Sequence, residues 1–175
     1  MTYRPSYGVF PRASAILFGI GLGGFFDSIV FQEVLQWHHM ISSWYPPTSL
    51  DNIRLNIRWD GFFHSATYLC LVLGIALFWR KASMRELYWS SEMLGGGMFM
   101  GWGAYNLVEG IVGHALLGMH HFNETVPASQ RPYWDLAFLA CGALMVFGGR
   151  LLERQADRRR KSRDVRVSYA SKAAG

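Results

Sequence analysis

Cysteine is scarce in this sequence: its 175 residues include only Cys70 and Cys141, and these form no C-x-x-C pair. Both lie inside apolar stretches, where a free cysteine behaves as a small hydrophobic residue. We therefore expect both side chains in the packed core. The scarcity excludes a metal site built from a cluster of thiolates, and it does not indicate a redox compartment.

The signatures of common soluble enzymes are also missing. The sequence has no Ser-His-Asp order, no glycine-rich phosphate loop and no EF-hand pattern. Instead it is 51% hydrophobic and carries 17 Lys and Arg. Apolar spans with basic flanks are typical of membrane proteins rather than of a soluble domain. Soluble-enzyme chemistry is therefore unsupported, and we expect no binding of nucleic acid.

Four long apolar runs dominate the chain. They cover residues 13–37, 61–79, 93–119 and 136–152. A helix needs about 20 apolar residues to cross a bilayer, and it satisfies its own backbone hydrogen bonds there. The fourth run is short unless Arg150 extends its charged end to the interface. The runs predict an all-α fold, an integral membrane bundle of four helices.

Glycines within the first and third runs predict close helix packing. They recur at the spacing of four residues that allows two membrane helices to approach each other. The glycines concerned are Gly19, Gly23, Gly97 and Gly101.

The distribution of Lys and Arg predicts the orientation. Fourteen lie in the N-terminal segment, the middle connection and the C-terminal tail, whereas three lie in the other two connections. The positive-inside rule then puts both termini in the cytoplasm, and we expect a multi-pass protein of the plasma membrane. We predict a cytoplasmic segment at 1–12, a transmembrane domain at 13–152 and a disordered basic tail at 153–175. The tail is expected to lie against the anionic inner leaflet.

The two halves of the transmembrane domain are similar to each other. Shifts of 82 and 75 residues align two acids, two His-His pairs and two Trp-Asp pairs. The aligned residues are Asp27 with Glu109, 38–39 with 120–121, and 59–60 with 134–135. We predict two copies of a two-helix unit, at about 13–79 and 93–152. Because each copy has two helices, both share one orientation and a pseudo-two-fold axis along the membrane normal.

Four motifs resemble a known family. They are GLGGFFDSIVFQEVLQWHHM at 21–40, WDGFFHSAT at 59–67, YNLVEGIVGHALLGMHHF at 105–122 and WDLAFLACGA at 134–143. The family consists of bacterial and archaeal four-helix predicted membrane proteins, a domain of unknown function, and the similarity covers about 14–150. The resemblance implies a four-helix integral membrane protein and assigns no reaction. The family's association with cytochrome oxidase assembly proteins points to copper.

This chain departs from the family pattern at two places. A histidine is frequent in the family where Gln32 stands, and Asp-His-His where 113–115 reads Gly-His-Ala. A site built on the family's full set of histidines would have fewer histidine ligands in this chain.

Helical geometry predicts where the acids lie relative to the histidines. At 100° per residue, Asp27 and His38 share one face of their helix, and so do Glu109 and His120. At 1.5 Å per residue, the acids lie about 16 Å deeper than the histidines, near the bilayer midplane. A charge at that depth costs at least about 2.5–3.5 kcal/mol, and no Lys or Arg is available there. We therefore expect both acids to face the interior of the bundle.

The same geometry gathers potential metal ligands at the outer end of the bundle. Imidazole and carboxylate groups suit copper, zinc or iron. The candidate ligands are His38, His39, His64, His114, His120, His121 and Asp60, with Asp135 in the same layer. Other interpretations stay open, because His pairs at a helix end can be interfacial and both Asp residues can cap their helices.

Three functions that involve a ligand or an ion remain open from the sequence, beside a structural or assembly subunit without a ligand of its own. The first is a metal-binding membrane protein in metal handling or respiratory-oxidase assembly. The second is a proton-coupled small carrier, or a proton relay through Asp27 and Glu109. The third is a haem protein with His38 and His120 as axial ligands. The expected partners are the lipid bilayer, a second copy of the chain and a respiratory assembly protein, and enzymatic activity is left open.

Overall fold

A computed structural model of the chain describes residues 10–84 and 89–173. Every regular element in these ranges is helical, which confirms the predicted all-α fold of four helices. The long helices are α1 (Arg12–Phe26), α2 (Leu50–Ser83), α3 (Ser91–Val108) and α4 (Arg131–Ala173). Two π-helical segments continue α1 and α3: η1 (Asp27–Val34) and η2 (Glu109–Leu116). Residues 1–9 of the expected cytoplasmic segment 1–12 lie outside the described residues, and so do residues 85–88 of the middle connection.

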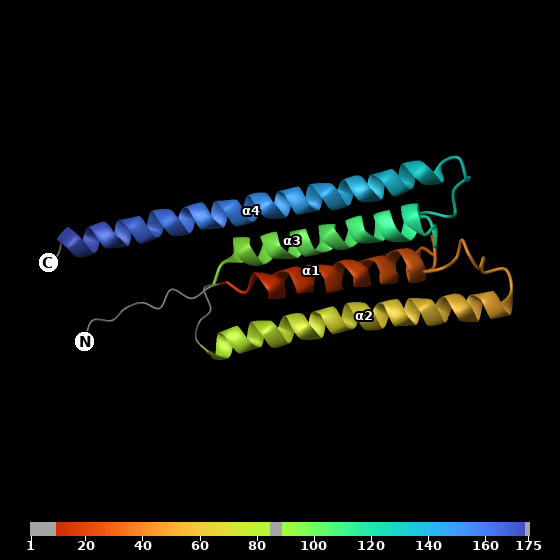
Figure 1. Ribbon diagram of the computed structural model, residues 1–175, viewed down its shortest axis with the longest axis horizontal. Helices are drawn as coiled ribbons and strands as arrows, with labels where there is room; N and C mark the ends of the chain where they lie inside the picture. The colour runs from red at the N-terminus through yellow and green to blue at the C-terminus, as the bar shows by residue number, and fades with distance from the viewer. Residues whose placement is uncertain (1–9, 85–88, 174–175) are drawn as a thin grey trace.

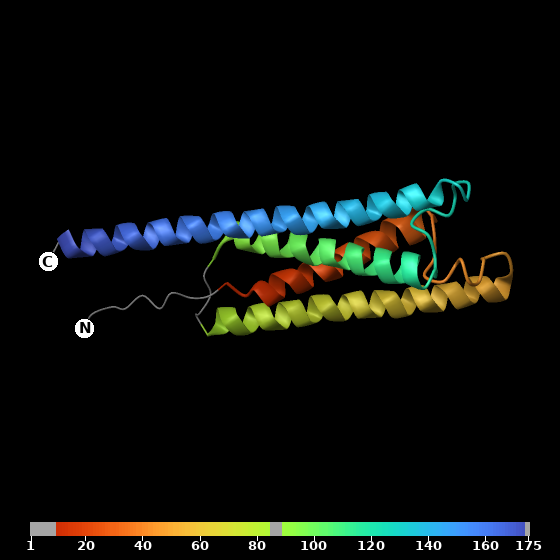
Figure 2. The same cartoon turned by 45° about the horizontal axis from the view of Figure 1, so that its top comes forward.

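The helices α1 and α3 form the centre of the bundle, and α2 and α4 lie on the outside (Figures 1 and 2). α3 packs against both α1 and α4, and α1 packs also against α2. The loops that follow η1 and η2 lie together at one end of the bundle, opposite the C-terminal end of α4 (Figure 1). Both His-His pairs are in these loops.

Glycines allow α1 and α3 to approach each other closely. A Cβ on Gly19 would lie 2.0 Å from the carbonyl oxygen of Met98, and a Cβ on Gly101 would lie 2.0 Å from that of Ile16. The obstructing atoms belong to the backbone, so no side-chain rotation could make room. The other two glycines of the predicted contact, Gly23 and Gly97, also leave no space for a Cβ. The predicted close packing of these helices is confirmed.

Three helical stretches are long and apolar enough to cross a membrane. They are Arg12–Val34, Leu50–Ser83 and Arg131–Val165. Among the described residues, no such stretch corresponds to the membrane span predicted at 93–119. Its helix α3 is rich in glycine, carries the buried polar residues Tyr105 and Asn106, and is sheltered between α1 and α4.

The helix α2 begins well before the apolar run that predicted it. Ser49 caps its N-terminus by accepting a hydrogen bond from the backbone N–H of Asn52. Asp60 therefore lies in the interior of α2, and Asp135 lies beyond the first turn of α4. Neither acid caps a helix, so that interpretation is wrong.

The helix α4 extends much further than predicted. It continues to Ala173, so the disorder predicted for 153–175 is wrong up to that residue. No proline or glycine interrupts 150–173, and the segment is rich in helix-forming residues. Glu153, which is 2% exposed, forms a salt bridge with Arg12, and Arg159 forms one with Glu92. These pairs tie the extension to the beginnings of α1 and α3.

The two cysteines are less buried than predicted. Cys141 is exposed on α4, and Cys70 is half-buried on α2. In a membrane bundle an apolar side chain can face lipid as readily as protein. An apolar run therefore does not by itself place a cysteine in the core.

Candidate functional site

Each His-His pair follows a π-helical segment and a sharp reversal of the chain. η1 ends with a hydrogen bond from the Leu35 N–H to the carbonyl of Val30, five residues back, and η2 ends in the same way. The next residues, Gln36 and Gly118, have left-handed backbones with φ of 50° and 55°. Glycine adopts this conformation freely, whereas glutamine does so at a cost. The chain thereby turns back toward the bundle instead of continuing outward.

This reversal brings the first histidine of each pair to the acid of its own half. Nε2 of His38 lies 3.5 Å from Oδ2 of Asp27, and Nε2 of His120 lies 3.5 Å from Oε1 of Glu109. The predicted separation of about 16 Å is wrong, because it assumed that each helix runs straight through its His pair. All four side chains are buried, which confirms that the acids face the interior of the bundle.

The imidazole rings of His38 and His120 stack on each other. Their centroids are 4.5 Å apart and their planes differ by 9°, so the predicted approach of these two residues is confirmed. Each ring is held by the opposite loop. Nδ1 of His38 donates to the carbonyl of Phe122 at 2.9 Å, and Nδ1 of His120 donates to the carbonyl of Met40 at 3.0 Å. Because a carbonyl can only accept, each neutral ring has an unprotonated Nε2. Nε2 of His38 has no hydrogen-bond partner, whereas Nε2 of His120 lies 3.2 Å from Nε2 of His114.

The second histidine of each pair binds an acid of an outer helix. Nδ1 of His39 lies 2.7 Å from Oδ2 of Asp60, and Nδ1 of His121 lies 2.7 Å from Oδ2 of Asp135. The other oxygen of each acid accepts, at 2.8 Å, the backbone N–H of the residue after the histidine. The hydrogen bond that His39 donates to Asp60 outweighs partial burial and raises the pKa of His39. Asp60 and Asp135 thus anchor the loops whose carbonyls hold the stacked rings.

Polar atoms around the stacked rings are buried without hydrogen-bond partners. They are both carboxylate oxygens of Glu109, Oδ1 of Asp27, Nε2 of His38, the Tyr105 hydroxyl and Oδ1 of Asn106. Leaving a buried polar group unsatisfied costs about 1–3 kcal/mol. A concentration of such atoms at one place points to a ligand or ion that they bind.

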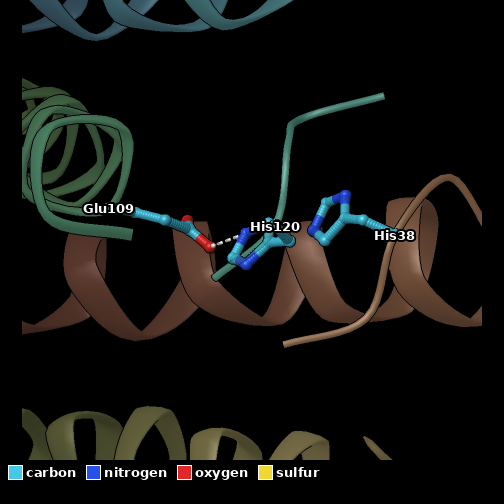
Figure 3. A group of neighbouring side chains, drawn as sticks. All are labelled: His38, Glu109 and His120. Atoms are coloured by element: carbon cyan, nitrogen blue, oxygen red, sulfur yellow. Dashed lines mark ion pairs between the residues drawn. The ribbon is translucent and has the colours of Figure 1, made fainter. Parts of the chain in front are cut away.

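His38, Glu109 and His120 form the group of potential metal ligands within the described parts of the chain. One ligand atom from each lies within 4.8 Å of the other two. Figure 3 shows Glu109 reaching from its helix toward His120, with His38 beyond it on the other loop. Two ligands at about 2.1 Å from a tetrahedral zinc ion are about 3.4 Å apart. The distances between these ligand atoms would therefore need to shorten by about 1.4 Å at most for the group to bind one ion.

The other predicted ligands differ in their positions. Nε2 of His114 lies 3.2 Å from Nε2 of His120, and its Nδ1 lies 3.2 Å from Oδ1 of Asp135. His114 is thus part of the buried cluster. His64 is half-buried on α2, where its ring stacks on Phe25 with centroids 6.4 Å apart, and it is not part of the three-residue group.

A cavity with several polar lining residues lies at the loop end of the bundle. It has a volume of about 830 Å³, and His38 lines it together with His39 and His121. Charged residues that the sequence did not assign to a site also line it: Glu33, Glu124 and Arg131. They meet only through the fold of the two loops, so their spacing along the chain gave no signal.

The structure also assigns roles to two backbone carbonyls that sequence reasoning missed. Met40 and Phe122 orient His120 and His38, and their side chains suggest nothing of the kind. Their only signal is position, because each directly follows a His-His pair.

The fold and the buried cluster define a class of membrane protein, a helical bundle with histidines and carboxylates joined beneath a polar cavity. The chain belongs to the family described as Predicted membrane protein (DUF2243), whose family model matches residues 14–156. The match runs from α1 into α4 and confirms the resemblance to a family of predicted membrane proteins. Searches of curated proteins and of solved structures find no match.

Proposed function

We propose that the protein binds a transition metal ion, copper, zinc or iron, through His38, His120 and Glu109. The observation that carries this proposal is the convergence of three buried ligand atoms, among which Nε2 of His38 and the Glu109 oxygens have no hydrogen-bond partner. Two imidazoles and one carboxylate are an established ligand set for zinc and for non-haem iron, and imidazole also suits copper. Such a set leaves coordination positions open for water or a substrate.

The hydrogen bonds of the two rings support the same proposal. A histidine that binds a metal through one nitrogen usually donates its other N–H to a carbonyl or carboxylate, which fixes the tautomer and the ring orientation. His38 and His120 both do so through Nδ1. Their Nε2 atoms are thus the nitrogens that would bind a metal, and at His120 the metal would replace the contact with His114.

We further propose that the two halves are copies of one two-helix unit, as the sequence similarity suggests. Paired contacts support this: each stacked histidine faces the acid of its own half, and each second histidine binds an acid of the following helix. Among the buried positions at which the halves differ, the first half has Gln32 where the second has His114. The additional imidazole favours one ion on the Glu109 side over two equivalent ions.

The location of the protein is part of the proposal. The excess of Lys and Arg in the terminal segments and the middle connection favours cytoplasmic termini in a bacterial inner membrane. The polar cavity would then open to the periplasm, where copper handling and oxidase maturation take place. In this position the site could receive or deliver metal without an ion crossing the bilayer.

Metal analysis of the detergent-purified protein tests the proposal directly. We expect about one equivalent of copper, zinc or iron after reconstitution, and its loss in the double variant His38→Ala/His120→Ala. His64→Ala is the matched control, because it removes an imidazole outside the three-residue group, and it should retain the metal. Equal metal content in all three proteins would refute the site.

A proton relay is the second candidate, favoured by the buried Asp27 next to a histidine that lines the cavity. Asp27→Asn separates the two functions. Proton movement in proteoliposomes would cease while metal content stays unchanged if the acid carries protons. If the metal is lost instead, Asp27 supports the metal site.

We do not propose haem. The stacked rings of His38 and His120 lie face to face with centroids 4.5 Å apart. Axial ligands must instead approach a haem iron edge-on from opposite faces of the porphyrin. The stack leaves no space for a porphyrin between them.

A further inference from the structure

A second cavity opens on the apolar side of the bundle, where α1, α3 and α4 meet. It has a volume of about 220 Å³. Six aromatic side chains line it: Phe26, Phe31, Trp102, Phe122, Trp134 and Phe138. We refer to it as the lateral pocket. Its walls suit a flat apolar group.

The lateral pocket has a polar end. Asp27 and Asn106 line it, and they are 2% and 4% exposed. Oδ1 of each has no hydrogen-bond partner, whereas Oδ2 of Asp27 accepts a hydrogen bond from Gln32. A carboxylate oxygen and an amide oxygen both accept hydrogen bonds. The occupant should therefore present hydroxyl donors to them.

A larger apolar groove of about 780 Å³ continues from the lateral pocket along α4. The two share Ala137, Cys141 and Met145, and the groove extends to Leu151 and Gln155. An occupant whose head lies in the pocket therefore has an apolar path for a long chain.

We propose that the lateral pocket binds a lipid-soluble phenol or quinol, with its hydroxylated ring against Asp27 and Asn106 and its alkyl chain along α4. The volume is adequate, because a cavity of about 150 Å³ already binds benzene. A fatty acid fits poorly, since its carboxylate would face the Asp27 carboxylate. A phospholipid headgroup stays at the interface, whereas Asp27 precedes the end of η1 by seven residues, about 10 Å.

This binding site goes beyond the metal site and does not depend on it. Asp27 lines the lateral pocket and also lies next to the metal site: its Oδ2 is 3.5 Å from Nε2 of His38, whereas its Oδ1 has no hydrogen-bond partner. A bound hydroxyl group would therefore lie one side chain away from the buried cluster. Chelator-treated protein should bind the phenol as well as metal-loaded protein does, so the two proposals can fail separately.

Cys141 reports occupancy, because it lines both the pocket and the groove. The test measures N-ethylmaleimide labelling in detergent-solubilised, chelator-treated Cys70→Ala protein, with 4-decylphenol as the probe. At ten times its dissociation constant, the probe should slow labelling of Cys141 about tenfold, since only the unoccupied fraction reacts. Labelling of Cys70 in a Cys141→Ala protein should not change, because Cys70 lies on α2.

Three comparisons make the test decisive. Decylbenzene has the same chain without the hydroxyl, and it should protect Cys141 much less. Asn106→Leu should weaken protection by 4-decylphenol by roughly fivefold, through the loss of one acceptor. Ala137→Phe should abolish it by filling the pocket, whereas Ala66→Phe on the exposed face of α2 should not. Equal protection by decylbenzene, or no protection by either compound, would overturn the proposal and leave only an apolar groove for detergent or lipid.

Discussion

Replacing Asp60 by alanine should disturb His120, although the two side chains belong to different halves of the chain. Asp60 is 2% exposed and accepts hydrogen bonds from Nδ1 of His39 at 2.7 Å and from the Met40 N–H at 2.8 Å. The carbonyl of Met40 in turn accepts from Nδ1 of His120 at 3.0 Å. Without the carboxylate, the loop segment that orients His120 loses its anchor on α2.

The contacts set the size of the effect. A hydrogen bond to a charged group contributes about 1.5–3 kcal/mol, so the two bonds together contribute about 3–6 kcal/mol. The His39 side chain is 21% exposed and can turn toward water after the change. We therefore expect a loss near the lower limit, about 3 kcal/mol. Metal affinity should fall by about 10–100-fold, the usual effect of removing a group that orients a ligand.

Thermal unfolding in detergent and a competition titration with zinc measure the two effects. The stability and the zinc affinity of Asp60→Asn should lie between those of Asp60→Ala and the native protein, because asparagine keeps one acceptor oxygen. Asp51→Ala is the matched control in the same helix, since that side chain is 95% exposed. If Asp60→Ala has the same melting temperature and the same zinc affinity as Asp51→Ala, the proposed chain of contacts to His120 is refuted.

Other parts of the fold give further predictions. Gly101→Ala should destabilise the bundle by about 1–3 kcal/mol, because its Cβ meets a backbone carbonyl. Gly148→Ala, with no atom within 4 Å of the new Cβ, should be neutral or stabilising in the same melting experiment; equal losses would show that the helices do not cross as described. Glu153→Gln should lower stability by about 1–2 kcal/mol through its salt bridge with Arg12, and a melting temperature equal to the native one would contradict this. In a cysteine-free background, a cysteine at Ser168 should react with an impermeant reagent only after the cells are opened. Labelling in intact cells would invert the proposed orientation.

The general architecture could be predicted from apolar length and glycine spacing, because both reflect what a bilayer requires. The close contact at Gly19 and Gly101 is an example, as is the burial of Asp27 and Glu109. The depth of the histidines could not be predicted. It depends on a π-helical segment and on a left-handed backbone at Gln36, a residue that seldom adopts that conformation.

The ends of the helices were also hard to predict, for a different reason. Hydropathy detects only the part of a helix that consists of apolar residues. The beginning of α2 at Leu50 depends on a cap, and the extension of α4 depends on pairs such as that between Arg159 and Glu92. These polar contacts form only after distant segments have met.

The exchange of carbonyls between the two loops has a consequence for the order of events during synthesis. His38 emerges from the ribosome long before Phe122, the residue whose carbonyl will hold its ring. The first hairpin must therefore enter the membrane with Asp27 and His38 in a provisional arrangement. The hydrogen bond of His38 can form only after the second pair of helices has been made. His120 then donates to the carbonyl of Met40, which belongs to the first pair. Separately expressed halves should each lack the finished site and recover it only when they are produced together.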